Sequence, residues 1–408
     1  MSAETLILVL LIVTALGFDF TNGFHDTGNA MATSIATGAL KPKVAVTIAA
    51  ILNLVGAFLS VEVATTVTKG VLNLPSNPSE LSSQVGGPQI ALTIISAGLV
   101  GAIIWNILTW LLGLPSSSSH ALFGGLIGSG LAASVSINWN GIVGKVIVPA
   151  ILAPVIACIV ASVGTMAIYA ITKKISESRK EANFRHGQIA TASLVSLAHG
   201  TGDAQKTMGV IALGLIVTGH LDPDIADKGL PLWVIGSCAA AIALGTYLGG
   251  WRIIRTLGKG LVEISAPQGM AAEASSAAII LTSSAAGMAL STTHVATGSI
   301  LGSGLGRKGA EVRWGVAGRM ALAWLTTLPA AAVVGAVSFW IAHSIGGAAG
   351  AITIFVILAA LSGWMWWRAQ QQKVDSSNVN AEWDDTTNSP VPAAIETDVV
   401  DIEPKQQA

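Results

Sequence analysis

The sequence is poor in charged residues. Only 11% of its 408 residues are Asp, Glu, Lys or Arg, whereas an ordinary soluble domain carries about 25%. Hydrophobic residues make up 52% of the chain, and the mean hydropathy is +0.68. A single water-exposed domain has too little polar surface in such a sequence. We therefore predict an all-α integral membrane protein whose helices need roughly 20 residues each to cross the bilayer.

Other absences exclude further classes of protein. The two cysteines, Cys158 and Cys238, lie inside apolar runs, so neither a disulfide framework nor a cysteine metal site is expected. A net charge of −1 provides no field that would attract nucleic acid. Since no glycine-rich nucleotide loop is found, we expect neither a cofactor nor ATP-driven transport.

Long apolar stretches recur along most of the chain. The helix-length ones cover residues 5–20, 44–66, 90–114, 142–172, 189–198, 231–250, 273–290, 318–342 and 347–367. Shorter Gly- and Ser-rich pieces separate them at 24–40, 121–135, 204–219 and 293–306. We expect these pieces to form broken helices or re-entrant hairpins, which are tolerated at membrane depth only where protein or a cavity covers them.

The charged loops predict the orientation of the chain in the cell membrane. Lys and Arg are concentrated at 41–43, 173–185, 252–259 and 307–313, which the positive-inside rule places in the cytoplasm. The nearly uncharged segment 68–88 and the acidic segment 220–228 are then external.

Four regions follow from these patterns. We expect a first membrane repeat at 1–172, a basic cytoplasmic linker at 173–187 and a second membrane repeat at 188–368. A disordered acidic tail is expected at 369–408 because this segment is rich in Asp and Glu and has few large apolar residues.

An internal repeat supports the division into two halves. Ser117-Ser118-Ser119-His120 returns as Ser291-Thr292-Thr293-His294, and seven of fifteen positions match at an offset of 174 residues. Each half also has an earlier acidic motif, within 22–29 and 198–206. The acidic motifs align at an offset of either 174 or 177. If each half crosses the membrane an odd number of times, the two are inverted-topology repeats with a substrate site near the midplane.

Three carboxylates lie in apolar surroundings: Asp26, Asp203 and Glu273. Exposing all three to lipid at helix centres would cost on the order of 8–10 kcal/mol. They must therefore face a cavity, a partner or a cation. One interpretation is pairing with Lys206 or an interfacial arginine, and the other is coupling of a proton or cation to transport.

The hydroxyl clusters have a different chemistry. Ser118, Ser119, Thr292 and Thr293 each stand between loop-like residues and an apolar glycine-rich helix. Hydroxyls and free backbone N–H groups at a helix N-terminus make a ready anion site. Simple N-capping without a ligand is the alternative. The presence of two equivalent clusters favours one anion site shared between the halves.

The histidines near these motifs have open roles. His120 and His294 could donate to neighbouring carbonyl groups, whereas His25 and His199 stand beside the acidic motifs and are candidates for a proton relay. An intramembrane hydrolase using Ser119 and His120 is disfavoured, because adjacent residues of one helix point in different directions. We expect no enzyme activity and no catalytic residues.

These motifs resemble those of the inorganic phosphate transporter (PiT) family of secondary carriers. The family motif G-x-N-D-x-x-N-A is similar to the segment 24–30, which keeps Asp26 and Asn29 but has His25 in place of the usual Asn. The motif H-G-x-N-D is matched by 199–203 except at its Asn, and this alignment favours the offset of 177. The family motif P-x-S-[ST]-[ST]-H is matched closely by 115–120.

The resemblance covers about residues 5–345 and implies import of inorganic phosphate by cation-driven symport across the cytoplasmic membrane. Phosphate would lie between the two hydroxyl clusters, with Gln205 as a further donor. Asp26, Asn29 and Asp203 would hold the coupling cations, and Glu273 would serve the same function. The resemblance also implies a homodimer, and no resident metal.

The coupling ion is predicted from one position at which this chain departs from the pattern of the sodium-coupled family members. Sodium-coupled members tend to have Glu where this chain has Asn53, whereas bacterial proton-coupled members resemble it in Gln205-Lys206. We therefore predict protons, with sodium as the alternative. The substrate is either free phosphate, which Lys206 could balance, or a neutral complex of phosphate with a divalent metal. Another oxyanion such as sulfate is a further alternative.

Overall fold

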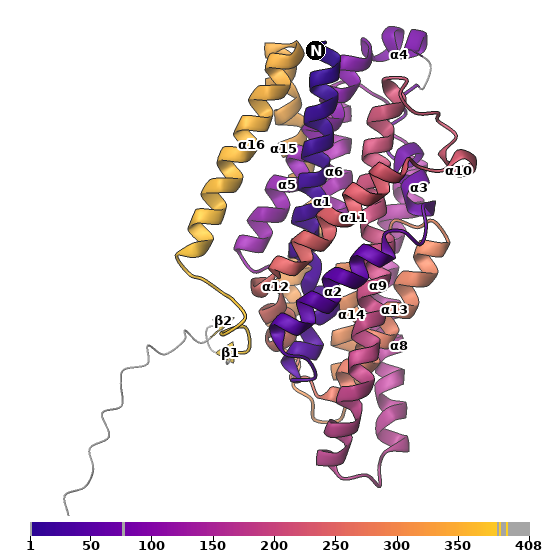
Figure 1. The fold of residues 1–408 in the computed structure, drawn as a ribbon. Helices are drawn as coiled ribbons and strands as arrows, with labels where there is room; N and C mark the ends of the chain where they lie inside the picture. Colours follow the sequence, from indigo (N-terminus) through magenta and orange to yellow (C-terminus); the bar gives the residue numbers. More distant parts are fainter. Residues whose placement is uncertain (1, 76–77, 382, 385–388, 391–408) are drawn as a thin grey trace, which may run out of the picture.

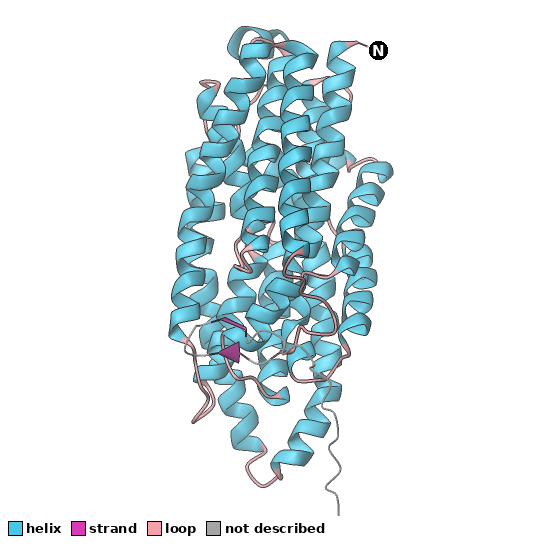
Figure 2. Cartoon of the chain, turned by 90° about the vertical axis from the view of Figure 1, so that its left-hand side faces the viewer, coloured by secondary structure: helices cyan, strands magenta, loops and turns pink. Residues whose placement is uncertain are grey.

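The computed structural model describes residues 2–75, 78–381, 383–384 and 389–390. It is an elongated helical bundle (Figures 1 and 2), with one pair of two-residue strands, β1 (Trp383–Asp384) and β2 (Ser389–Pro390). The helices are α1 (Ala3–Ala36), α2 (Pro42–Gly56), α3 (Glu62–Gly70), α4 (Pro78–Val85), α5 (Pro88–Leu111), α6 (Ser118–Ala132), α7 (Trp139–Ile142), the π-helical turn η1 (Val143–Ile147), α8 (Val148–Ile171), α9 (Glu177–Val217), α10 (Ile225–Lys228), α11 (Leu232–Leu248), α12 (Trp251–Arg255), η2 (Thr256–Gly260), α13 (Ala266–Ala285), α14 (Thr292–Leu305), α15 (Trp314–Ile345) and α16 (Gly347–Gln370).

Among the described residues, five helices are long and apolar enough to cross a membrane. They are α1, α5, the continuous run 139–171, α15 and α16. The number rises to six if α11 and the bent segment 251–260 form one span, broken by a 59° bend. The prediction of an all-α, multi-pass membrane protein is confirmed.

The helices that carry the acidic motifs differ from the prediction. Separate short pieces were expected at 24–40 and 204–219, but α1 continues without a break to Ala36 and α9 continues without a break to Val217. The expectation of broken helices at these two places is wrong. Small and polar residues lower the hydropathy there, yet they face protein rather than lipid, so the helical hydrogen bonds continue. The segment expected as a linker is also mostly helical, because α9 begins at Glu177.

Breaks do occur before the hydroxyl motifs. Gly113 follows α5 with a φ of +66°, and Gly287 follows α13 with a φ of +63°. Both values lie in the left-handed region, where glycine ends a helix without a steric penalty. A short connection then leads into α6 or α14, so the first turn of each begins inside the protein. The break expected from Gly113-Leu114-Pro115 and from Gly287 is confirmed.

Close helix packing is repeated at the same offset in both halves. A side chain at Gly128 of α6 would collide with the backbone of Ala332 in α15. A side chain at Gly302 of α14 would collide with the backbone of Cys158 in α8. Gly302 lies 174 residues after Gly128, and Cys158 lies 174 residues before Ala332. The second contact therefore repeats the first with the two halves exchanged. Each hydroxyl-motif helix therefore packs against a helix of the other half.

The first helix of each half runs in the opposite direction to the other. α1 descends from the N-terminus at the top of Figure 1, while α9 rises from its connection with α8 at the bottom. The basic segments around 41–43 and 173–185 lie toward the bottom, and α4 and α10 lie toward the top. Applied to this arrangement, the positive-inside rule places the bottom in the cytoplasm.

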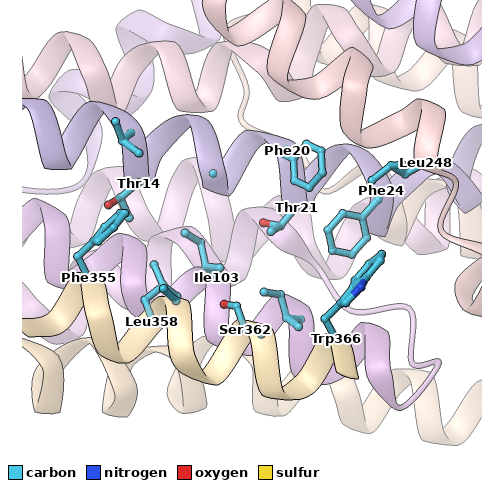
Figure 3. Close-up of a pocket in the computed structure, with 15 residues that line it drawn as sticks. Thr14, Phe20, Thr21, Phe24, Ile103, Leu248, Phe355, Leu358, Ser362 and Trp366 are labelled. Carbon is cyan, nitrogen blue, oxygen red and sulfur yellow. The ribbon is translucent and has the colours of Figure 1, made fainter. Parts of the chain in front are cut away.

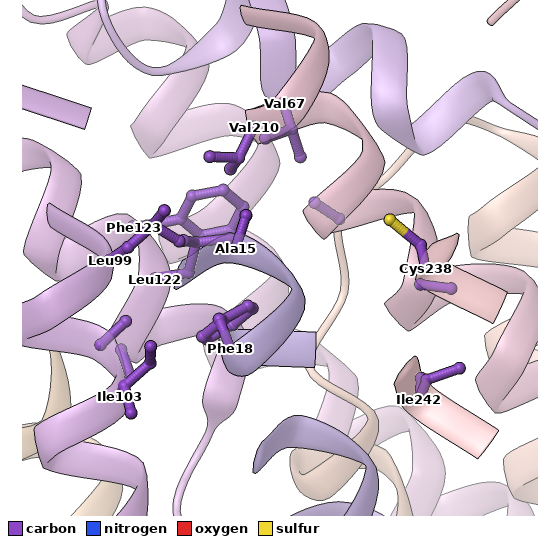
Figure 4. Packing of buried hydrophobic residues seen from close by; sticks show 14 of the residues in the cluster. Ala15, Phe18, Val67, Leu99, Ile103, Leu122, Phe123, Val210, Cys238 and Ile242 are labelled. Carbon is purple, nitrogen blue, oxygen red and sulfur yellow. The ribbon is translucent and has the colours of Figure 1, made fainter. Parts of the chain in front are cut away.

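Apolar side chains fill the upper part of the bundle. Phe18 and Ala15 of α1, Phe123 of α6 and Val210 of α9 lie close to one another there (Figure 4). A cavity of about 520 Å³ lies between α1, α5, α11 and α16 (Figure 3). Its lining is apolar apart from hydroxyls such as Thr21 and Ser362 and the indole of Trp366, and it has none of the charged side chains that favour an oxyanion.

The beginning of the expected tail is packed against the bundle. Residues 371–381 follow α16 and reach α12, where Arg255 donates to the carbonyl oxygen and to Oδ1 of Asn378 at 3.1 and 3.0 Å. Asn380 donates to the carbonyl oxygen of Ile35 at 3.3 Å. Most of the remaining expected tail lies outside the described residues.

Candidate functional site

The side chain of Asp26 is the point where three segments meet. It lies on α1, is buried, and accepts a hydrogen bond from Ser118 of α6 at 2.5 Å. Thr293 of α14 approaches its other oxygen at 3.4 Å. Nδ1 of the neighbouring His25 lies 2.7 Å from that same oxygen. Two helix N-termini that are far apart in the sequence therefore converge on one carboxylate.

Asn29 extends this contact by one helical turn. Its amide nitrogen donates to Thr293 Oγ1 at 3.0 Å and lies 3.4 Å from Thr292 Oγ1. Because residues three apart on a helix share a face, Asp26 and Asn29 address the same hydroxyl cluster. The structure thus brings Asp26 and Asn29, which were expected at the coupling site, into contact with the two threonines expected at the substrate site.

Asp203 has an equivalent position on α9 but a different partner. Lys206 Nζ lies 2.6 Å from one oxygen of Asp203, and Thr292 Oγ1 donates to the other at 3.2 Å. The contact from Thr292 to Asp203 repeats the contact from Ser118 to Asp26. This correspondence pairs Asp26 with Asp203, so the offset of 177 holds for the acidic motifs.

Lys206 is fully engaged within the site. Besides Asp203, its ammonium group donates to Ser119 Oγ at 2.5 Å and to the carbonyl oxygen of Leu290 at 3.1 Å. An ammonium group has three N–H donors, and these three acceptors occupy them. Pairing with Lys206 was one of the two interpretations of the buried carboxylates, and the structure shows this pairing for Asp203.

The two carboxylates are close enough to interact strongly. One ligand atom from each of Asp26, His199 and Asp203 lies within 4.8 Å of the other two, and all three residues are buried. Like charges at this separation in a dry interior repel strongly unless a proton or a cation lies between them. With neutral histidines, the two carboxylates and Lys206 leave the site with one net negative charge.

The first turns of α6 and α14 are capped in the same way. Ser117 Oγ accepts from the backbone N–H of His120 at 3.2 Å, and Ser291 Oγ accepts from that of His294 at 3.3 Å. The caps leave the N–H groups of the two positions before each histidine without an acceptor inside the helix. N-capping and anion binding are therefore compatible, because the capping serine and the free N–H groups belong to different residues of the motif.

The two repeat histidines meet each other. The rings of His120 and His294 lie 4.8 Å apart in an edge-to-face arrangement, and His294 Nδ1 lies 3.1 Å from the carbonyl oxygen of Ala150. Ser119 faces Lys206, so no Ser–His dyad forms between Ser119 and His120. The hydrolase alternative finds no support in this geometry.

Two predicted residues lie apart from the hydroxyl cluster. Gln205 accepts from the backbone N–H of Val63 at 2.7 Å and donates to Thr201, so its amide group caps α3. Glu273 accepts from Thr33 at 2.5 Å and from Thr191 at 2.6 Å. The carboxylate of Glu273 is therefore held between α1 and α9, about two helical turns beyond Asp26 along α1.

Some polar contacts of the site were missed by sequence reasoning. His25 Nε2 lies 3.2 Å from Thr109 Oγ1, and His199 Nδ1 lies 3.1 Å from Asn53 Oδ1. Asn53 also donates to Thr246 at 2.8 Å. The presence of Asn53 in an apolar helix was the only signal that could have identified such a contact, and it does not specify the partner.

Comparison with known proteins agrees with this geometry. The model of the phosphate transporter family matches residues 22–335, a range that contains both acidic motifs and both hydroxyl motifs. The chain belongs to the phosphate transporter family. Its relatives are transporters, and it is a transporter rather than an enzyme.

Individual relatives extend the match over most of the chain. A probable low-affinity inorganic phosphate transporter of Mycobacterium bovis is 57% identical over 94% of this chain and 89% of its own length. A protein of the same description from Bacillus subtilis is 41% identical, over 83% of this chain and 98% of its own length. A solved structure titled "The sodium-dependent phosphate transporter" has a TM-score of 0.70 at 22% identity and covers 83% of this chain and 100% of its own. At this identity, the last comparison supports the fold alone.

Proposed function

We propose that this protein imports inorganic phosphate across the cytoplasmic membrane by symport with protons. The observation that carries the proposal is the convergence of the first turns of α6 and α14 on Asp26. Ser118 and Thr293 bring hydroxyl groups, and the free N–H groups of both helix N-termini add donors that suit a tetrahedral oxyanion. The names of the relatives support phosphate as that oxyanion.

The charges of the site explain why an anion needs a cation. The site already has one net negative charge when its histidines are neutral, so phosphate would add to the repulsion. A proton on the Asp26–His25 pair would remove one negative charge. If that proton is on Asp26, the neutral carboxyl group is a weaker acceptor for the hydroxyl of Ser118, and that hydroxyl could then donate to phosphate instead. Proton binding and phosphate binding would thereby favour each other.

The two halves supply the geometry for alternating access. We infer that they are inverted repeats, because α1 and α9 run in opposite directions and the contacts of α6 and α14 are exchanged between halves. A buried site between two such halves is reached from either side when one half moves relative to the other. The homodimer implied by the resemblance stays a prediction, which crosslinking in membranes would check.

The choice of phosphate over sulfate rests on the two carboxylates. Near neutral pH, phosphate can donate a hydrogen bond to Asp26 or Asp203, whereas sulfate has no proton to donate. A neutral complex of phosphate with a divalent metal would also suit the negative site. Full competition by sulfate at equal concentration would contradict phosphate selectivity.

Uptake by the purified protein in proteoliposomes tests the whole proposal. Labelled phosphate uptake would be measured under a pH gradient and a sodium gradient imposed separately, each with and without magnesium. We expect uptake to follow the pH gradient in sodium-free buffer. Uptake that requires sodium and ignores the pH gradient would establish the sodium alternative, and a strict magnesium requirement would identify the metal complex as substrate.

A further inference from the structure

A second buried carboxyl group lies on α1, away from the site described above. Asp19 has no exposed surface, and neither of its carboxylate oxygens has a hydrogen-bond partner among the described residues. Asn22, one turn further along α1, is equally buried, and both of its amide atoms lack a partner. Thr207 on α9 is near enough to Asp19 to interact with it, but its hydroxyl makes no hydrogen bond of regular geometry with any described residue. Unpaired polar atoms of this kind are rare inside proteins and require an explanation.

The positions of these residues form one stripe along α1. Asp19, Asn22, Asp26, Asn29 and Thr33 follow the spacing of three and four residues that places side chains on a single helix face. Asp19 lies seven residues before Asp26, which corresponds to about 10 Å along the helix axis. Thr33 lies seven residues after Asp26.

The stripe arranges three carboxyl groups in sequence across the bundle. Thr33 donates to Glu273 at 2.5 Å, so that carboxyl stands at the lower end of the stripe. Asp26 stands in the middle and contacts the hydroxyl clusters. Asp19 stands at the upper end, which the positive-inside rule makes external. The spacing along α1 is equal on both sides of Asp26.

The groups facing Asp19 leave its charge uncompensated. From α9 these are Asp203 and Lys206, and from α11 the thiol of Cys238. α5 contributes no titratable side chain. The ammonium group of Lys206 has all three of its donors directed to other acceptors.

Apolar packing completes the surroundings. Phe18, Val210 and Ile242 belong to the buried cluster at this level of α1, α9 and α11 (Figure 4). A carboxylate ion without a hydrogen bond is strongly disfavoured in such a place, whereas a neutral carboxyl group is tolerated. A buried ionisable group that changes its charge inside a membrane marks an ion pathway.

We propose that Asp19 is a second proton-binding residue of the transport cycle, on the external side of Asp26. One carboxylate oxygen takes a proton from the external water, which converts the carboxylate ion into a neutral carboxyl group. The same proton leaves toward the cytoplasm when phosphate is released, and the carboxylate is restored. This inference rests on the proposed function, because it adds a proton to a proton-coupled phosphate symporter.

The test uses the full chain in proteoliposomes with three variants. Asp19→Asn keeps the shape of the side chain but removes the titratable proton, and Asp19→Glu restores a carboxyl group. Thr21→Val is the matched control, since Thr21 lies two residues away and lines the apolar cavity of Figure 3. Two quantities are measured: exchange of labelled phosphate at equal phosphate and pH on both sides, and protons moved per phosphate, recorded with a pH dye inside the vesicles.

We expect Asp19→Asn to keep phosphate exchange within about two-fold of the unmodified protein and to move one proton fewer per phosphate. Accumulation driven by a pH gradient should fall accordingly. Asp19→Glu and Thr21→Val should retain the original proton count. An unchanged count in Asp19→Asn would overturn the proposal, as would loss of phosphate exchange in a folded Asp19→Asn protein.

A spectroscopic measurement covers the case in which Asp19→Asn does not fold. Infrared difference spectra on phosphate binding should show a protonated carboxyl band that shifts in Asp19→Glu, and a band that does not shift would contradict the proposal. If the unmodified protein itself ignores pH gradients, the proposed function fails together with this inference. If the unmodified protein couples to protons and Asp19→Asn behaves identically, only this inference fails.

Discussion

The two acidic centres of the molecule occupy equivalent places and are compensated differently. Each carboxylate lies near a histidine, Asp26 at 2.7 Å from His25 and Asp203 at 3.4 Å from His199, but Asp203 also contacts the ammonium group of Lys206 at 2.6 Å. Ser118 and Thr292 make the corresponding contact in each half. The comparison teaches that the repeat preserves the hydroxyl–carboxylate contact and varies the counter-charge. The first centre therefore gains a counter-charge only with a proton, whereas the second has the ammonium group of Lys206 beside it, a difference that supports the proposed coupling to protons at the first centre.

The largest loss of phosphate uptake is expected when Asp26 loses its charge. Asp26→Asn removes the carboxylate that connects α6, α14 and His25. The loss of one partner from a buried ion pair costs several kcal/mol, so we expect concentrative phosphate uptake to fall by roughly 100-fold or more. The measurement is uptake driven by a pH gradient, with membrane insertion checked separately. Ser34→Ala is the control, because Ser34 is buried on α1 and donates only to Met31 of its own helix. Normal accumulation by Asp26→Asn would remove this residue from coupling.

Loss of the counter-charge that Lys206 gives to Asp203 should affect the stability of the protein as well as phosphate uptake. Lys206→Gln leaves Asp203 buried without a cation, which costs about 3–5 kcal/mol when one partner of such a pair is removed. His25→Gln should cost less, because an imidazole gives Asp26 a counter-charge only when it holds an extra proton. Thermal unfolding of the purified variants in detergent measures both effects. The double variant Asp203→Asn with Lys206→Gln should recover most of the stability lost in Lys206→Gln, and equal losses in the single and double variants would contradict the comparison.

The equivalent hydroxyls should be equally important. Ser118→Ala and Thr292→Val each remove one hydrogen bond to a carboxylate, an interaction worth about 1.5–3 kcal/mol. We expect the KM for phosphate to rise by roughly 10- to 100-fold in each variant. A difference of more than ten-fold between the two variants would show that the halves bind phosphate unequally.

The smallest effects are expected at the capping serines. Ser117→Ala and Ser291→Ala each remove an N-cap, which costs about 1 kcal/mol of stability. Their hydroxyl groups accept from the backbone and make no contact with Asp26 or Asp203. Thermal unfolding should therefore shift while the KM for phosphate stays constant. A changed KM would mean that these serines also contact the substrate.

Much of the site was predictable because the sequence repeats itself. The duplicated hydroxyl motif and the isolated carboxylates Asp26 and Asp203 identified residues that the structure brings together. The continuity of α1 and α9 was not predictable from hydropathy, since polar residues facing protein lower the hydropathy of a helix without breaking it. The placement of Gln205 on the end of α3 and of Glu273 beside Thr33 depends on contacts between distant segments.

The sequence by itself determined the class of the protein, the positions of most helices, the repeat and the chemistry of its motifs. These properties depend on composition and on neighbouring residues along the chain. Only the tertiary structure decided which counter-charge each carboxylate has and that His120 and His294 meet. It also decided that Asp19 is buried without a regular hydrogen bond from any described residue. Hydrogen bonds act over about 3 Å, so the pairing of groups that lie more than a hundred residues apart is settled by the packing of helices.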